Sequence, residues 1–103
     1  MSKPHLLITG ASGYLGGHLI AALAKNKEYN LTALDVRTNS RFPDSVQFVK
    51  ADLNDVAQLS DALDGINLIC HCASLINSSS FTSEQYLRIN IKGTQNLYQQ
   101  AKE

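Results

Sequence analysis

Short apolar runs alternate with longer amphipathic stretches along the chain. The run at 6–9, built on Leu6, Leu7 and Ile8, is unbroken and is followed by a glycine, which is typical of a strand buried on both faces. Similar short runs at 31–35, 46–49 and 66–70 predict three further strands. The pattern therefore indicates four strands, each too short to be an independent unit.

The stretches between and after these runs have helical spacing. Residues 14–25 place Leu15, Leu19, Ala22 and Leu23 at steps of three and four, which predicts a helix with these side chains on its buried face. Residues 55–63 predict a short helix, which either Asn54 or Asp55 can cap and which Gly65 follows.

The last stretch, 83–103, also has a helical pattern, with Ser83 as its expected cap and Gly93 as a weak point inside it. Strands that alternate with helices favour a parallel sheet with crossover helices. Right-handed crossovers place those helices on both faces of the sheet. The expected fold class is thus α/β, a doubly wound parallel sheet of four strands and three helices.

Composition narrows the class of protein. The chain has 103 residues, the size of one small domain, with 44% hydrophobic and 17% charged residues, which is a globular composition. Nine basic and nine acidic side chains cancel, so no net field favours nucleic acid or an acidic membrane surface. No apolar run is long enough to span a membrane and no signal peptide is recognisable, which makes the cytoplasm the expected location.

The cysteines and histidines do not predict a metal site. Cys70 and Cys72 are two positions apart in an expected strand, so both point to one face, a geometry that suits a disulfide badly. We expect two reduced, packed thiols. His5, His18 and His71 have no partners at metal-ligand spacing, so we expect no metal.

Three glycines at three-residue spacing mark the first strand–helix junction. Gly10 permits a sharp turn, Gly13 lets a pyrophosphate approach the backbone, and Gly16 allows close packing of the helix on the strand. Within this loop, which includes Ser12, the N–H groups around Tyr14 and Leu15 have no partners inside the helix and form a candidate anion site.

Asp35 ends the second expected strand, close to the spacing of about 20 residues that a dinucleotide-binding loop requires of its ribose-binding acid. The alternative for Asp35 is a solvated loop carboxylate. A carboxylate here repels a 2′-phosphate and favours NAD over NADP, although the guanidinium of Arg37, just after Val36, could accept that phosphate. Asp52 and Leu53 follow the third strand, where a carboxylate can bind the amino group of adenine; the alternative for Asp52 is a helix cap.

Five motifs in order resemble the extended short-chain dehydrogenase/reductase family, which includes sugar-nucleotide epimerases and 3β-hydroxysteroid dehydrogenases. They are TGASGYLG at 9–16, LDVR at 34–37, ADL at 51–53, HCAS at 71–74 and NIKGT at 90–94. The resemblance covers essentially the whole chain and implies the first half of a Rossmann-like domain that holds a dinucleotide across the carboxyl ends of its strands.

The resemblance also implies further site residues. The backbone of Cys72, Ala73 and Ser74 would pass under the nicotinamide-side ribose and phosphate, and His71 resembles the family's structural histidine. Asn90 matches the asparagine that supports the active-site backbone and a proton-relay water. The implied activity is that of an NAD(P)-dependent oxidoreductase or epimerase, which acts on a secondary alcohol or keto group of a sugar-nucleotide or hydroxysteroid-like small molecule.

The catalytic part of that family is not found in these 103 residues. A literal Tyr-x-x-x-Lys is present at Tyr98 and Lys102, but it lies on the helix that carries NIKGT rather than on the one after a fifth strand. We therefore expect Tyr98 to pack on the sheet and Lys102 to be solvated. Residues 1–103 are interpreted as the N-terminal part of an NAD(P)-binding domain, with catalytic and substrate regions absent.

Such a segment is expected to bind the dinucleotide weakly and to be inactive alone. A homodimer of the complete protein stays open, because the family's usual dimer uses later helices. The alternative function is a non-catalytic NAD(P)-sensing or binding module.

Overall fold

The computed structural model describes residues 3–37, 42–73 and 82–102. Its centre is one parallel sheet in the order β3-β2-β1-β4. The strands are β1 (His5–Thr9), β2 (Asn30–Asp35), β3 (Val46–Lys50) and β4 (Leu68–His71). Leu7 of β1 is in register with Thr32 of β2 and Ile69 of β4. The predicted α/β class is confirmed.

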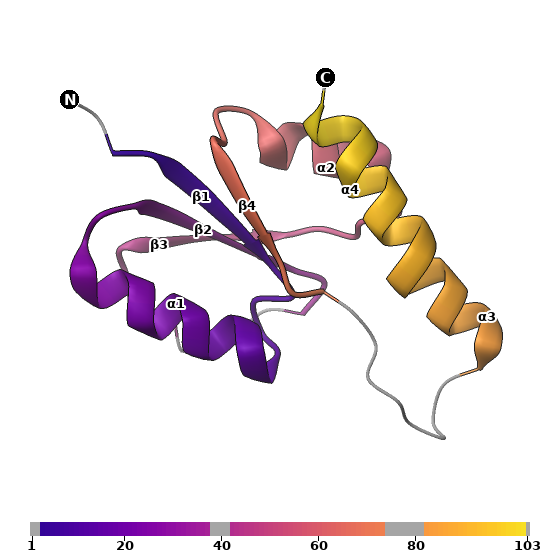
Figure 1. The fold of residues 1–103 in the computed structure, drawn as a ribbon, viewed down its shortest axis with the longest axis horizontal. Coiled ribbons are helices and arrows are strands. Elements are labelled where there is room, and N and C mark those ends of the chain that lie inside the picture. The colour runs from indigo at the N-terminus through magenta and orange to yellow at the C-terminus, as the bar shows by residue number, and fades with distance from the viewer. Residues whose placement is uncertain (1–2, 38–41, 74–81, 103) are drawn as a thin grey trace.

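Helices cover both faces of the sheet (Figure 1). One face carries α1 (Tyr14–Asn26); the other carries α2 (Val56–Leu63) and α4 (Thr94–Ala101). A continuous helical rod is formed by α3 (Ser83–Tyr86), the π-helical segment η1 (Leu87–Gly93) and α4. This is the doubly wound arrangement that the order of elements predicts.

Alternate residues of β1 supply the two layers of the core. Leu6 and Ile8 pack with Ile20 of α1, whereas Leu7 packs on the other side with Leu59 of α2 and Leu97 of α4. A strand with both faces buried needs such an unbroken apolar run. The predicted strand with two buried faces is therefore confirmed.

The predicted buried face of α1 is confirmed for Leu19 and Leu23, which pack partly buried against the core, and is wrong for Leu15 and Ala22. Leu15 is 65% exposed and Ala22 is exposed, while Gly16 and Ile20 are buried. The close approach of Gly16 to the preceding turn sets the rotation of the helix, so the buried face is centred on Gly16 and Ile20 and is flanked by Leu19 and Leu23.

Hydrogen bonds explain where β4 begins and which residue caps α2. β4 begins at Leu68 rather than at Ile66, because Asn67 is used to hold β1: its N–H donates to the His5 carbonyl and its side-chain oxygen accepts from the His5 N–H. Of the two candidate caps for α2, Asp55 is the one that accepts a bond, from the Gln58 N–H.

The C-terminal rod begins with a capping box at Thr82, one residue before the predicted cap at Ser83. The Thr82 hydroxyl accepts from the Gln85 N–H, and the Gln85 side chain accepts from the Thr82 N–H. Gly93, the predicted weak point, is buried where η1 meets α4. A Cβ on it would lie 3.3 Å from Cβ of Leu53, so a small residue is needed there.

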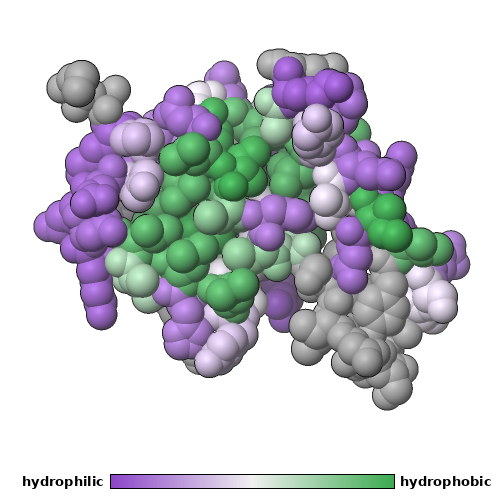
Figure 2. Space-filling model, viewed as in Figure 1, coloured by the Kyte–Doolittle hydropathy of each residue, from purple (hydrophilic) through white to green (hydrophobic). Residues whose placement is uncertain are grey.

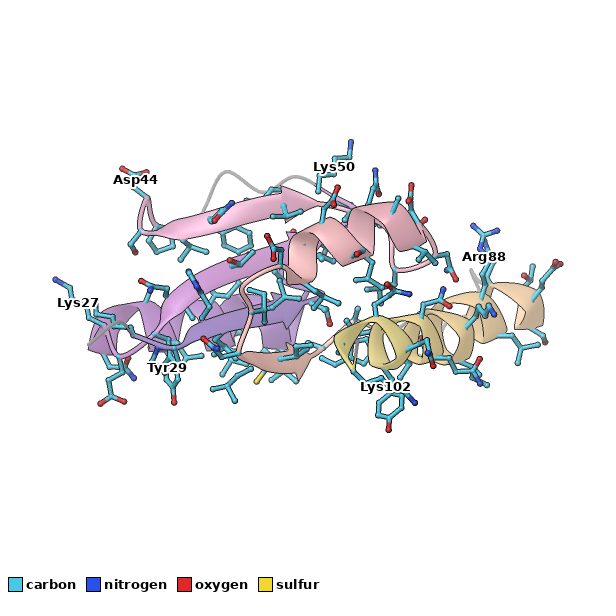
Figure 3. All side chains as sticks on the ribbon, turned by 90° about the horizontal axis from the view of Figure 1, so that it is seen from above. Lys27, Tyr29, Asp44, Lys50, Arg88 and Lys102 are labelled. Carbon is cyan, nitrogen blue, oxygen red and sulfur yellow. The ribbon has the colours of Figure 1, made fainter. Side chains whose placement is uncertain are left out.

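The surface is divided between charged and apolar regions. Figure 3 shows Lys27, Asp44, Lys50 and Arg88 pointing outward from the rim of the molecule. Figure 2 shows a broad apolar surface across the middle of the viewed face. In the part of the chain that the structure describes, no helix is both long and apolar enough to cross a membrane.

Candidate functional site

The carboxyl ends of β1, β2 and β4 meet at one edge of the sheet, beside the first turn of α1 (Figure 1). In doubly wound sheets a ligand binds at this edge. The loops that follow these three strands contain most of the predicted site residues.

The turn after β1 is possible only with glycine. Gly10 has φ +65°, and a Cβ on it would lie 2.6 Å from the backbone nitrogen of Ala73. A Cβ on Gly16 would overlap the carbonyl oxygen of Gly10. The turn, the first turn of α1 and the loop after β4 are thus packed backbone against backbone.

The N-terminus of α1 is open to a ligand. Gly13 is the N-cap residue, no side chain caps the helix, and the first turn has no acidic residue. Tyr14 and Leu15 are 86% and 65% exposed. The N–H groups at such a helix start, together with the positive end of the helix dipole, attract an anion.

Asp35 is held against this loop. It is 9% exposed, one carboxylate oxygen accepts from the Ser12 N–H at 2.9 Å, and the other accepts from the Arg37 N–H at 3.2 Å. The Ser12 hydroxyl donates to the Arg37 carbonyl. The alternative of a solvated loop carboxylate is therefore wrong. Val36 and Arg37 remain exposed beside it.

The loop after β3 holds Asp52 and Leu53 in different ways. Asp52 accepts from the Asn54 N–H at 2.9 Å, and it is not the cap of α2, which is Asp55. Leu53 is 6% exposed in the core, and its carbonyl accepts from the side chain of Asn96 at 3.1 Å. The adenine-side role of both residues stays a prediction.

The loop after β4 is pinned by one threonine. The hydroxyl of Thr9, itself fully buried, accepts from the N–H groups of Cys72 at 3.1 Å and Ala73 at 3.2 Å. Burial, and then the neighbouring Cys70, raises the pKa of the Cys72 thiol, so this sulfur stays protonated near neutral pH. Ser74 lies outside the described residues.

His71 joins this loop to the C-terminal rod, a link that the sequence did not reveal beyond a resemblance. Its Nδ1 lies 2.6 Å from the Thr9 hydroxyl and its Nε2 lies 2.8 Å from the Thr94 hydroxyl. Thr94 in turn donates to the carbonyl of Asn90. The threonines of the TGASGYLG and NIKGT motifs were the available signal.

The expected packing of Tyr98 on the sheet is wrong. Tyr98 is 69% exposed, and its neighbour Leu97 is the residue of α4 that enters the core. Lys102 lies over the Tyr98 ring, 5.6 Å from its centre. α4 runs back toward the edge where the strands begin, so this pair is far from the glycine turn (Figure 1).

Two further features complete the surroundings. Both cysteines are free, and both pack partly against the core on the α1 face. A groove of about 360 Å³ runs along the flank of α1, next to the glycine turn, and its lining includes Ser12, Tyr14, His18, Phe42 and Pro43. Among the described residues, no cluster of histidine, cysteine and acidic side chains could hold a metal ion.

Comparison with known sequences gives relatives over most of the chain. The chain is 34% identical over 96 residues to human sterol-4-alpha-carboxylate 3-dehydrogenase (decarboxylating). The aligned region covers 93% of this chain and 25% of that protein. It is 27% identical over 96 residues to 3 beta-hydroxysteroid dehydrogenase/Delta 5-->4-isomerase of monkeypox virus, with 87% and 28% covered.

Solved structures share the fold. A variant of uronate dehydrogenase from Agrobacterium tumefaciens, complexed with NAD, superposes with a TM-score of 0.83 at 30% identity and covers 97% of this chain. UDP-glucuronic acid 4-epimerase from Bacillus cereus, in complex with UDP-glucuronic acid and NAD, superposes with a TM-score of 0.80 at 27% identity and covers 96%. The chain spans 37% and 36% of these two structures.

The sequence pattern of one family fits nearly the whole chain, from residue 7 to residue 103. The five motifs, the parallel sheet and these relatives agree with it, and the predicted kinship with dehydrogenases and epimerases of the short-chain type is confirmed. The chain belongs to the 3-beta hydroxysteroid dehydrogenase/isomerase family.

Proposed function

We propose that this chain is the dinucleotide-binding part of an NAD-dependent oxidoreductase or epimerase. The observation that carries the proposal is the bond between the Ser12 N–H and the Asp35 carboxylate, because it brings a ribose acceptor and an uncapped helix start together. Structural relatives solved with NAD support the choice of cofactor.

The residues present fit such a group. Gly13 has no side chain to block a pyrophosphate at the helix start, Gly10 and Gly16 allow the tight turn behind it, and the N–H groups of Tyr14 and Leu15 would bind the anion. A carboxylate offers about four lone-pair sites, and two of those on Asp35 are used within the protein, which leaves acceptors for ribose hydroxyls.

The other loops would hold the two ends. Asp52 would accept from the adenine amino group beside Leu53, and the backbone of Cys72, Ala73 and Ser74 would lie under the nicotinamide-side ribose. Asn90 would support that side through its place in η1. When bound, nicotinamide supplies the hydride chemistry. The buried charge of Asp35 would disfavour a 2′-phosphate and so select NAD over NADP.

The complete protein, of which residues 1–103 would be the N-terminal part, would use this site on a secondary alcohol or keto group. The relatives divide between sterol and uronate or sugar-nucleotide substrates, and the family pattern favours a hydroxysteroid-like one. We infer that residues 1–103 alone are inactive. We also infer that the protein is located in the cytoplasm, and that any dimer would use residues outside 1–103.

A non-catalytic NAD(P)-sensing module is the second candidate. It is favoured by one observation: the Tyr-x-x-x-Lys match, Tyr98 and Lys102, lies at the end of α4 away from the candidate site. An extended protein that binds NAD but does not reduce it with any secondary alcohol would support this candidate.

Calorimetric titration of the chain with NAD and with NADP tests the main proposal. Asp35→Ala removes charge-assisted acceptors and should weaken NAD binding roughly 10- to 100-fold. Asp35→Asn keeps one oxygen acceptor and should reduce the preference for NAD. The exposed Asp44→Ala is the matched control and should bind as the unchanged chain does. Undetectable binding at millimolar NAD would overturn the proposal.

A further inference from the structure

The ring of His71 is held between two hydroxyl groups from different parts of the fold. Nδ1 lies 2.6 Å from Oγ1 of Thr9 at the end of β1, and Nε2 lies 2.8 Å from Oγ1 of Thr94 at the start of α4. His71 itself ends β4. One imidazole therefore connects a strand end, a neighbouring strand end and the helical rod.

The side chains of Thr9, His71 and Thr94 form a hydrogen-bond relay. The hydrogen bonds around Thr9 fix the direction of this relay at one end. A hydroxyl has one proton and two lone pairs. Both lone pairs of Thr9 are taken, because Oγ1 accepts from the N–H groups of Cys72 and Ala73. The Thr9 proton is then donated to Nδ1 of His71, which must be unprotonated.

The other end fixes the same tautomer independently. The Thr94 hydroxyl donates its proton to the carbonyl of Asn90 at 2.9 Å, so it can accept from His71. Nε2 must carry a proton to be the donor. Both ends of the relay thus require a neutral imidazole protonated at Nε2. Each group donates a proton to the next, from Thr9 through His71 and Thr94 to the carbonyl of Asn90.

A second proton on His71 would place two donors against each other at Thr9. The Nδ1–H would face the Thr9 O–H across 2.6 Å. Thr9 can relieve this only by turning its proton toward Cys72 or Ala73, which takes the lone pair from that amide. The N–H of Cys72 has a second acceptor, the Thr9 carbonyl at 3.2 Å, so the Ala73 N–H is the more vulnerable.

That amide belongs to the candidate site. A Cβ on Gly10 would lie 2.6 Å from the Ala73 nitrogen, so the backbone of Ala73 lies directly against the glycine turn. Loosening the Ala73 amide would shift the Cys72–Ala73 backbone, which we propose lies under the nicotinamide-side ribose. It would also disturb the turn that leads into α1.

The surroundings leave His71 able to respond to pH. Burial lowers its pKa from 6.5, and His71 as a residue is exposed, so protons can reach it. The titratable and charged groups on the elements packed around it are His5 on β1, Cys70 and Cys72 on β4 and its loop, Arg88 and Lys92 on η1, Tyr98 on α4, and Lys102 at the C-cap of α4. The sequence of segment 74–81 contains no ionisable side chain.

We propose that His71 is a positioning residue whose neutral ring holds the Cys72–Ala73 backbone in its binding geometry through Thr9, and whose protonation loosens that backbone and weakens dinucleotide binding. The coupling to the ligand rests on the proposed function. The relay itself concerns the chain without ligand and can be judged separately.

Nitrogen NMR of the histidine rings tests the relay first. At about pH 7.5, where an unperturbed histidine is neutral, His71 should show a bare Nδ1 and a protonated Nε2. On acidification, the amide resonance of Ala73 should shift with the same midpoint as the His71 ring. The opposite tautomer, or an Ala73 amide indifferent to that titration, would overturn the relay.

Titration with NAD at about pH 7.5, and at a pH below the His71 midpoint measured by NMR, tests the coupling. Loss of one hydrogen bond predicts binding roughly 3- to 10-fold weaker at the lower pH. His71→Asn places a side-chain oxygen near the position of Nδ1 and cannot titrate, so the ratio of its affinities at the two pH values should stay close to one.

The exposed His5→Asn, at the start of β1, is the matched control and should keep the pH dependence. The same pH dependence in His71→Asn would overturn the coupling. Failure of the unchanged chain to bind NAD at either pH would overturn the proposed function and the coupling together, while the ring tautomer and the Ala73 shift still decide the relay.

Discussion

β1 and β4 are paired along their length, yet they are covered very differently. Every residue of β1 after His5 is buried, whereas the two ends of β4 are exposed and its middle is only partly buried. Leu7 is fully buried, while Leu68 is 47% exposed at the open edge of the sheet. The apolar surface in Figure 2 lies over the side where β4 lies in Figure 1.

The candidate site is divided along the same line. The side that we propose for phosphate and adenosine, formed by the glycine turn and Asp35, follows the buried strands β1 and β2. The side that we propose for nicotinamide, formed by Cys72 and Ala73, follows β4. Packing therefore positions the first side, and the hydrogen bonds of Thr9 and His71 must position the second. The following substitutions and one pH series test that division.

Gly10→Ala breaks the contact between the two sides. It forces a side chain into φ +65° and against the Ala73 nitrogen, so the free energy of unfolding should fall by roughly 2 to 5 kcal/mol. Urea denaturation measures this loss. Gly17→Ala is the matched control: its Cβ would meet only the Ala11 carbonyl at 3.6 Å, and it should be neutral or stabilising. Equal losses in both variants would contradict the packing described for the turn.

Leu7→Ala and Leu68→Ala compare the strands directly. The cavity at the fully buried Leu7 should lower the free energy of unfolding by about 3 kcal/mol, and truncation of the half-exposed Leu68 by less than about 1 kcal/mol. Urea midpoints at constant slope give both values. A larger effect at Leu68 would mean that the edge of β4 is covered in solution.

Thr9→Val removes the acceptor of two amides and the partner of His71 with little change of shape. The free energy of unfolding should fall by about 1 to 3 kcal/mol because two partly buried N–H groups lose an acceptor. Thr94→Val removes one acceptor at a more exposed position and should cost about 0.5 to 1.5 kcal/mol. Hydrogen exchange should speed up at Ala73 in the first variant more than in the second; the reverse order would count against Thr9 as the main anchor.

The smallest effect is a pH dependence of stability. Burial lowers the pKa of His71 below 6.5 in the folded chain, so the unfolded chain binds a proton first as the pH falls. Stability from this residue is complete above pH 6.5 and is lost as the pH falls from there through the lower folded pKa. Thermal unfolding across this range should show the loss in the unchanged chain and a smaller one in His71→Asn. A chain that became more stable on acidification through this window would contradict the sign.

Local patterns predicted most of the fold but not how its loops lock together. The unbroken run of Leu6, Leu7 and Ile8 identified a strand with two covered faces, and Gly10 identified the turn. The rotation of α1 was not predictable, since it depends on the contact of Gly16 with the Gly10 carbonyl. The link from Thr9 through His71 to Thr94 was not predictable either, because it joins distant parts of the chain. Thr9 and His71 are 62 positions apart, and His71 and Thr94 are 23 positions apart.

The candidate site shows the same limit. The position of Asp35 at a strand end was readable from spacing, but its bond to the Ser12 N–H needs two loops to be placed in space. The position of Tyr98 was predicted wrongly because a four-residue helical spacing does not say which side of α4 meets the core. In the structure it is Leu97, and not Tyr98, that enters the core.

Amide chemical-shift mapping during an NAD titration shows whether the dinucleotide binds at the start of α1. We expect the largest shifts at Gly13, Tyr14 and Leu15, a smaller one at Ala73, and none at Lys50 on the outer strand. Shifts confined to the flank of α1 around His18 and Phe42, or no shifts at millimolar NAD, would contradict binding there.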